Sequence, residues 1–188
     1  MIRIISLFVF VLITGCVSQT EHTPSAWLKP GVKIELPSPG LDVPMSEQQL
    51  LTAKVKGKSH SLIALLDVNQ ERISLAGLSS LGVRLFLVTY DAGGIRTEQS
   101  ITLPELPPAE QVLSDIMLSY WPIARWETQL PQGWTLVDKD LVRELRDEQQ
   151  QLVSQIHYQN IDGQRAPVQI DNQTFSYQIT IGHLGAVQ

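Results

Sequence analysis

The feature that constrains this chain most is an apolar run that ends close to its only cysteine, Cys16. Residues 4–13 are all apolar or small, they follow the cationic Arg3, and Gly15 stands directly before the cysteine. A basic start, a short apolar run and a small residue before a cleavage point are typical of an export signal. The run is too short for a transmembrane helix, which takes about 20 residues. We therefore expect residues 1–15 to be a cleaved signal peptide.

Residues 12–16, Leu-Ile-Thr-Gly-Cys, resemble the lipobox of bacterial lipoproteins. The resemblance implies acylation of Cys16, and stable attachment to a membrane takes about two acyl chains. Val17 follows Cys16, where enterobacterial lipoproteins retained in the inner membrane have Asp. The resemblance thus implies a lipid-anchored protein of the outer membrane that faces the periplasm. The alternative is an ordinary signal peptide with an unmodified cysteine.

Length and charge restrict what the rest of the chain can be. Removal of residues 1–15 from 188 leaves 173, enough for one well-buried domain. The chain has 14 Lys and Arg against 19 Asp and Glu, and nucleic-acid binding needs clustered basic residues. We therefore expect no nucleic-acid partner. A single cysteine allows no internal disulfide, so packing must hold the fold together.

The polar segment after the signal peptide predicts a tether. Residues 16–33 are rich in Ser, Thr, Gln and Pro, with few apolar side chains to fix them. We expect one domain to follow, over residues 34–188. Prolines at 37, 39 and 44 predict extended or turned chain, and residues 45–51 are expected to form a short helix.

Short β-type runs separated by turn residues fill residues 51–102. The candidate strands are residues 52–56, 61–67, 72–75, 83–90 and 95–101, which predicts an antiparallel meander. Residues 62–66 are apolar throughout, and residues 83–90 place Phe86 and Val88 on one face with Leu85 and Leu87 on the other. We therefore expect apolar cover on both faces of this sheet.

A helix is predicted over residues 109–121, with Pro108 at its start and Pro122 after its end. Its polar residues, including Ser114, Asp115 and Ser119, fall on the opposite side from the apolar stripe. Such a stripe packs on a core, lines a ligand cavity, or does both. The candidate cavity residues are Phe86, Val88, Val112, Leu113, Ile116, Met117, Tyr120 and Trp121.

Residues 140–160 fit two structures. Leu141, Val142 and Leu145 begin a helical stripe that continues to Ile156, in a segment rich in Glu, Arg and Gln. Alternatively, residues 142–146 and 152–159 form a hairpin, followed by strands at 166–171 and 175–181. The pattern alone does not decide between them.

The strand run, the single helix and the lipobox together resemble LolB and LolA, the bacterial lipoprotein receptor and carrier. The resemblance implies an α+β, mainly β fold, an incomplete antiparallel β-barrel with a helical lid over an apolar cavity. Residues 73–85, with the turn at 91–94, resemble a LolB strand–turn–strand unit, and residues 152–158 resemble a LolB strand, which favours the hairpin. Leu81 matches the protruding LolB leucine implicated in membrane insertion, although Ser80 replaces the usual proline. An inward-folded Leu81 is the alternative.

Residues 111–122 are similar to a stretch of a LolB-like outer-membrane lipoprotein family often encoded beside aryl-polyene biosynthesis genes. That resemblance implies handling of an amphiphile, either an aryl-polyene lipid or lipoprotein acyl chains. The partners implied are membrane lipids through Cys16, the amphiphile itself, and a LolA-like periplasmic carrier or an exporter.

No motif for catalysis is present. Residues 77–81 lack the second glycine of a Gly-x-Ser-x-Gly elbow, and the four histidines have no metal-ligand spacing. We expect no enzyme activity, cofactor or metal. The tryptophans at 27, 121, 126 and 134 either line a cavity or close a core. The leading hypothesis is a lipid-binding or lipid-transferring lipoprotein. The alternatives are an assembly lipoprotein with a filled core and, third, a lipid-modifying enzyme.

Overall fold

The computed structural model describes residues 24–99 and 107–186. Within them, one α-helix and one 3-10 turn accompany twelve strands. The strands are β1 Ser25–Lys29, β2 Val32–Glu35, β3 Met45–Val55, β4 Lys58–Val68, β5 Ile73–Leu78, β6 Arg84–Asp91, β7 Gly94–Gln99, β8 Thr135–Lys139, β9 Val142–Arg146, β10 Leu152–Ile161, β11 Gln164–Asn172 and β12 Tyr177–Ala186; the helical elements are α1 Ala109–Tyr120 and η1 Ile123–Arg125.

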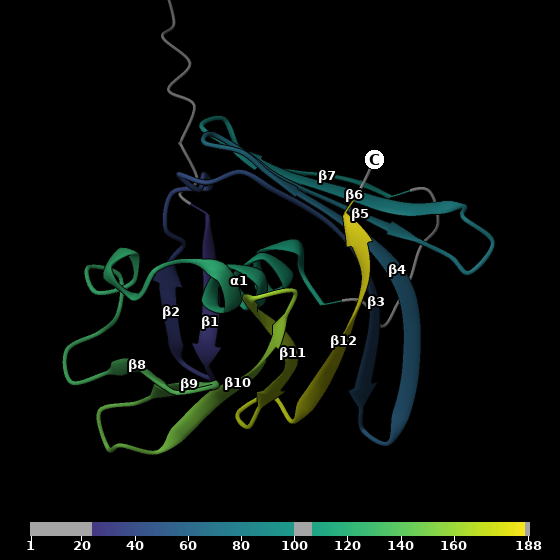
Figure 1. Ribbon diagram of the computed structural model, residues 1–188. Coiled ribbons are helices and arrows are strands. Elements are labelled where there is room, and N and C mark those ends of the chain that lie inside the picture. The colour runs from purple at the N-terminus through teal and green to yellow at the C-terminus, as the bar shows by residue number, and fades with distance from the viewer. Residues whose placement is uncertain (1–23, 100–106, 187–188) are drawn as a thin grey trace, which may run out of the picture.

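Ten strands form one antiparallel sheet in the order β7-β6-β5-β4-β3-β12-β11-β10-β9-β8. The sheet curves strongly around α1, with β5–β7 above the helix, β3, β4 and β12 beside it, and β8–β11 below it (Figure 1). Among the described residues the end strands β7 and β8 do not pair, so the barrel stays open. The predicted fold class, a mainly β fold in which an incomplete antiparallel β-barrel is accompanied by one helix, is confirmed.

Local sequence explains the long β3–β4 hairpin at the middle of the sheet. Every residue from Met45 to Val55 pairs with one on β4, and the turn between them is Lys56-Gly57, both at positive φ (48° and 80°). A two-residue turn with this backbone matches the twist of paired strands. The predicted short helix at residues 45–51 is therefore wrong, because pairing with both β4 and β12 outweighs the helix preference of Glu and Gln.

The hairpin interpretation of residues 140–160 is confirmed. Strands β9 and β10 pair across a turn in which Asp147 Oδ1 accepts hydrogen bonds from the backbone N–H groups of Gln149 (3.0 Å) and Gln151 (2.9 Å). An aspartate side chain often stabilises a turn by accepting a hydrogen bond from the backbone N–H two residues later. Strand β8 was not predicted, because only Leu136 of its five residues is buried and the apolar alternation is weak.

The predicted tether is wrong in its second half. Residues 25–35 form an antiparallel hairpin of β1 and β2, which we call the N-terminal hairpin. It is a separate two-stranded sheet, and it stands beside α1 between the two ends of the large sheet (Figure 1). Alternate residues Ala26, Leu28 and Ile34 are buried in the main core, so the folded domain starts before residue 34.

Candidate lipid-binding interior

The eight predicted cavity residues come together in one cluster. Leu113, Met117 and Trp121 have no exposed surface, and Phe86 and Val88 are buried on the concave face of β6. Val112, Ile116 and Tyr120 are partly buried against the same cluster. Phe86 also packs on Gly77 of the neighbouring strand, where a Cβ atom would lie 2.2 Å from the ring. The sequence therefore located the interior beneath α1, whose side chains fill it.

The polar side of α1 is buried as well, contrary to what its amphipathic pattern predicts. Ser114, Asp115 and Ser119 are all inaccessible, because strands cover the helix on this side too. Tyr177 of β12 donates a hydrogen bond to Asp115 Oδ2 (2.5 Å), and Asn172 of β11 donates to the Tyr177 hydroxyl (3.1 Å). Burial raises the pKa of Asp115 to about 7. It also raises the pKa of Tyr177.

The C-terminal end of α1 is held by a buried arginine. Arg143 of β9 donates from Nη1 to the carbonyl oxygens of Leu118 and Trp121, both at 2.8 Å. Its other guanidinium nitrogens pair with Asp138, whose pKa is lowered by that hydrogen bond. Tyr158 of β10 donates to the Ser119 carbonyl (2.8 Å). A cation at this end also interacts favourably with the helix dipole.

A third polar group joins α1 to the middle of the sheet. Tyr120 donates a hydrogen bond to Glu47 Oε2 (2.9 Å), and Gln49 Nε2 donates to both of these side chains at 2.6 Å. His183 Nδ1 lies 3.2 Å from the same Glu47 oxygen. Burial and the neighbouring Glu47 carboxylate raise the pKa of Tyr120, so its hydroxyl stays neutral and donates.

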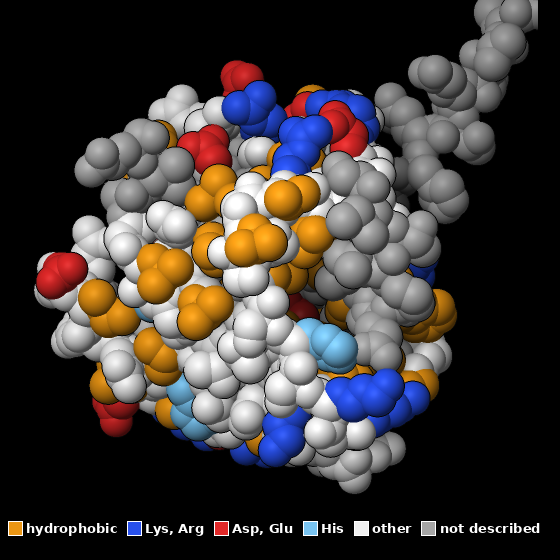
Figure 2. All heavy atoms as spheres, turned by 90° about the vertical axis from the view of Figure 1, so that its right-hand side faces the viewer, with side chains coloured by type: hydrophobic (Ala, Val, Ile, Leu, Met, Phe, Trp, Pro, Cys, Tyr) orange, Lys and Arg blue, Asp and Glu red, His pale blue; other side chains and the backbone are white. Residues whose placement is uncertain are grey.

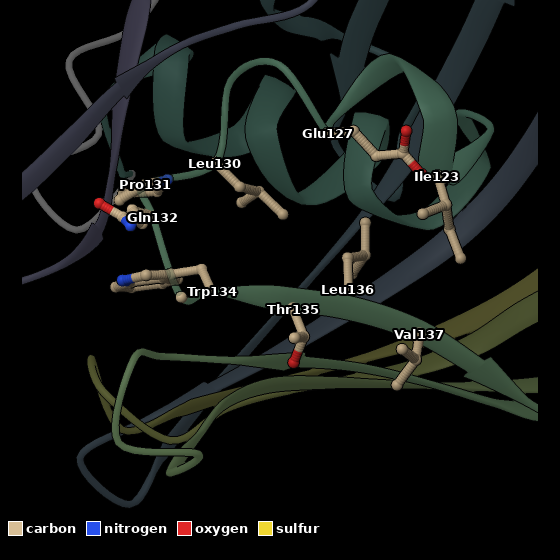
Figure 3. A pocket seen from close by; sticks show the side chains of 10 residues that line it. Ile123, Glu127, Leu130, Pro131, Gln132, Trp134, Thr135, Leu136 and Val137 are labelled. Carbon is tan, nitrogen blue, oxygen red and sulfur yellow. The ribbon is translucent and has the colours of Figure 1, made fainter.

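Two open hollows lie on the surface beside this interior. The larger, of about 390 Å³, runs between the η1 region and strand β8, and Ile123, Leu130, Trp134 and Leu136 point into it (Figure 3). The second, of about 310 Å³, opens beside Lys29 and the β9–β10 turn. Neither is lined by the eight predicted cavity residues. Trp121, Trp126 and Trp134 all belong to the buried core cluster, so three of the four tryptophans close the core, and Trp27 is exposed.

Leu81 projects from the β5–β6 turn with 89% of its surface exposed. The Ser79 hydroxyl oxygen accepts hydrogen bonds from the N–H groups of Leu81 (3.3 Å) and Val83 (3.2 Å), and Gly82 follows at φ 76°. These bonds fix the turn although Ser80 stands where LolB has proline. Of the two predicted orientations, the structure has the outward one.

The convex face of the same half-sheet is apolar, and no described helix covers it. Leu50, Ile63 and Leu78 oppose one another on β3, β4 and β5, and the next outward row is Leu65, Ala76 and Leu87. Figure 2 views this side, where hydrophobic side chains gather between a basic lower rim and a mixed upper rim. Leu50 is exposed and the others are half-buried. Among the described residues α1 covers only the concave face, so the predicted apolar cover of the convex face is not found there and stays a prediction.

Other kinds of site are not found. In the part of the chain that the structure describes, no group of three or more His, Cys, Asp or Glu side chains could hold a metal ion. No helix within those residues is long and apolar enough to cross a membrane. Cys16 lies outside the described residues.

The fold and interior define an open β-barrel with a buried helix across its concave face. The chain belongs to the family described as "Protein of unknown function (DUF3261)", whose model matches residues 46–185. No curated protein matches it in sequence. It is similar in structure to a domain assigned to outer membrane lipoprotein sorting in Vibrio parahaemolyticus, with 11% identity and a TM-score of 0.40 over 74% of this chain and 83% of that one.

Proposed function

We propose that this protein is a non-enzymatic outer-membrane lipoprotein that binds or transfers an acylated or otherwise hydrophobic lipid at the periplasmic face. The observation that carries the proposal is the apolar interior of an unclosed sheet, where α1 and the N-terminal hairpin take the place of further strands. Apolar interiors with a few placed polar groups suit amphiphiles. The lipobox at Cys16 would hold the protein at the membrane that supplies or receives the lipid.

Leu81 has a role in the same proposal. A leucine held outward in a fixed turn can enter the acyl region of a membrane, where its burial is favourable by about 2 kcal/mol. The cargo would be an aryl-polyene lipid or lipoprotein acyl chains, and the donor a LolA-like periplasmic carrier. No cofactor or metal takes part.

Mass spectrometry of organic extracts from the purified protein tests the proposal. We expect a stoichiometric amphiphile in the extract from the wild-type protein and less of it from Met117→Trp, since Met117 lies at the centre of the interior. An extract with no amphiphile would count against the proposal. Palmitate labelling tests the anchor separately: Cys16→Ser should lose the label, and a mutant that labels fully would exclude acylation at this residue.

A second candidate is an assembly lipoprotein that docks a lipid exporter or carrier. It is favoured by one observation: the eight predicted cavity residues are packed in a filled core. Under this alternative no lipid copurifies, and the apolar convex face carries the interaction instead.

A further inference from the structure

The N-terminal hairpin fills the opening of the barrel. Ala26 and Leu28 of β1 are each 2% exposed, and Ile34 and Leu36 at the far side of the hairpin are also buried. All four belong to the cluster that contains Leu113, Met117 and Phe86. An amphiphile entering this interior would need the volume that the hairpin side chains now occupy, since cores are packed close to crystal density.

The hairpin is attached to the rest of the domain differently from the strands of the large sheet. It forms its own two-stranded sheet, so in the described residues no strand pairing joins it to the other ten strands. An isolated two-stranded hairpin is marginal in water. Between its two ends the hairpin is held by apolar burial, which an acyl chain can replace without breaking strand pairing to the large sheet.

The two ends of the hairpin are held differently. At its base, the chain that follows β2 is fixed, because Tyr90 donates to the Pro37 carbonyl (3.0 Å) and Trp121 Nε1 donates to the Ser38 carbonyl (3.0 Å). At its tip, Lys29 is the contact: its ammonium lies 3.0 Å from Asp147 Oδ2, 3.2 Å from Glu148 Oε1, and 5.1 Å from the Trp134 ring centre. The tip thus latches onto the β9–β10 turn, and one of the open hollows lies beside this latch.

We propose that the N-terminal hairpin occupies the acyl-chain site, and that the acyl chain of an amphiphile binds by displacing the hairpin from beside α1 while its base stays attached. This inference rests on the proposed function. The ion pairs of Lys29 with Asp147 and Glu148 then keep the site closed.

Hydrogen exchange measured by mass spectrometry tests the proposal. The full-length mature lipoprotein is held in lipid nanodiscs and titrated with 1-myristoyl-lysophosphatidylcholine. We expect faster exchange in peptides covering residues 25–35 and slower exchange in those covering α1 and β6, while peptides from β10–β11 stay unchanged.

Two lysine variants identify the latch. Lys29→Ala should lower the lysophospholipid concentration for half-maximal hairpin exposure by about threefold, because it raises the fraction of molecules with an open site. Lys33→Ala is the matched control: Lys33 is exposed on β2, and its ring contact is with Trp27 at 5.8 Å, so it should leave the concentration unchanged. Equal effects of the two variants would exclude the latch.

The outcomes separate this proposal from the one on which it rests. Slower exchange at α1 and β6 without faster exchange in the hairpin would overturn hairpin displacement and leave lipid binding intact. No change at any concentration in any peptide would overturn both.

Discussion

The two halves of the large sheet hold α1 in different ways. Toward β8–β12, the helix is fixed by directional contacts: Arg143 and Tyr158 bind its C-terminal carbonyls, and Tyr177 binds Asp115 near its middle. Toward β5–β6, the same core cluster offers apolar side chains, chiefly Leu75, Phe86 and Val88. Hydrogen bonds constrain distance and angle, whereas apolar contact does not.

This difference indicates which side of the interior can change. A ligand that replaces apolar contacts on the β5–β7 side would leave the polar contacts of α1 with β9, β10 and β12 intact. The helix would then stay in place while the N-terminal hairpin moves. The exposed Leu81 lies at the β5–β6 turn, on the same half of the sheet.

The largest effect on stability is expected from Arg143→Met. The substitution removes the hydrogen bonds to the Leu118 and Trp121 carbonyls and leaves Asp138 without its main partner. Leaving the Leu118 and Trp121 carbonyl oxygens without their buried donor lowers the free energy of unfolding by about 1–3 kcal/mol for each carbonyl. Urea unfolding of the wild-type protein and the variant measures this change in the free energy of unfolding. Arg84→Met is the control, because Arg84 is exposed and its pair with Glu98 (3.4 Å) should be worth less than about 1 kcal/mol. Similar losses in both variants would contradict the asymmetry.

Asp115, which is bonded to β12, makes the stability of the folded protein sensitive to pH. Its folded-state pKa of about 7 lies above the usual value of 3.8, so between these values the folded protein binds a proton that the unfolded chain does not. The contribution of this group to stability is therefore present at low pH and is lost as pH rises through about 7, by about 1.4 kcal/mol per pH unit from pH 5 to 7. Asp115→Asn should flatten this part of the stability curve measured in urea. An unchanged slope would exclude Asp115 as its source.

Met117→Trp tests whether the apolar interior can open to admit a ligand. Overpacking a filled core lowers the free energy of unfolding by about 1–3 kcal/mol. If the interior opens for a ligand, binding of an apolar fluorescent probe should fall by more than this loss explains. Leu145→Phe is the comparison, since Leu145 is equally buried but lies on β9, in the fixed half. Probe binding that falls equally in both variants would indicate a uniform solid core.

The sequence predicted the apolar contacts of the interior better than the polar ones. The apolar stripe of α1 identified the helix side of the interior, because burial on one face leaves a period in the sequence. Strand β6 is apolar on both faces in the sequence, and the structure shows that the face with Phe86 and Val88 is the buried one. The polar contacts of α1 could not be predicted: Asp115, Arg143 and Tyr177 are far apart in the chain, and each resembles an ordinary surface residue. The N-terminal hairpin was missed because its strands are short and follow a polar, proline-containing segment, so their burial depends on contacts far along the chain.

The smallest effect on stability is expected at Leu81, together with a large effect on function. Leu81→Glu changes a side chain that is 89% exposed and leaves the Ser79 hydrogen bonds of the turn in place, so the free energy of unfolding should change by no more than about 0.5 kcal/mol. A charge cannot enter the acyl region of a bilayer at low cost, so transfer of amphiphile to liposomes should be lost. Val83→Glu is the matched control, because Val83 is also exposed, at 54%, but follows the tip of the turn. Unchanged transfer by Leu81→Glu at unchanged stability would remove the membrane role from this turn. Equal loss in both variants would assign the role to the surface around the turn and not to the single leucine.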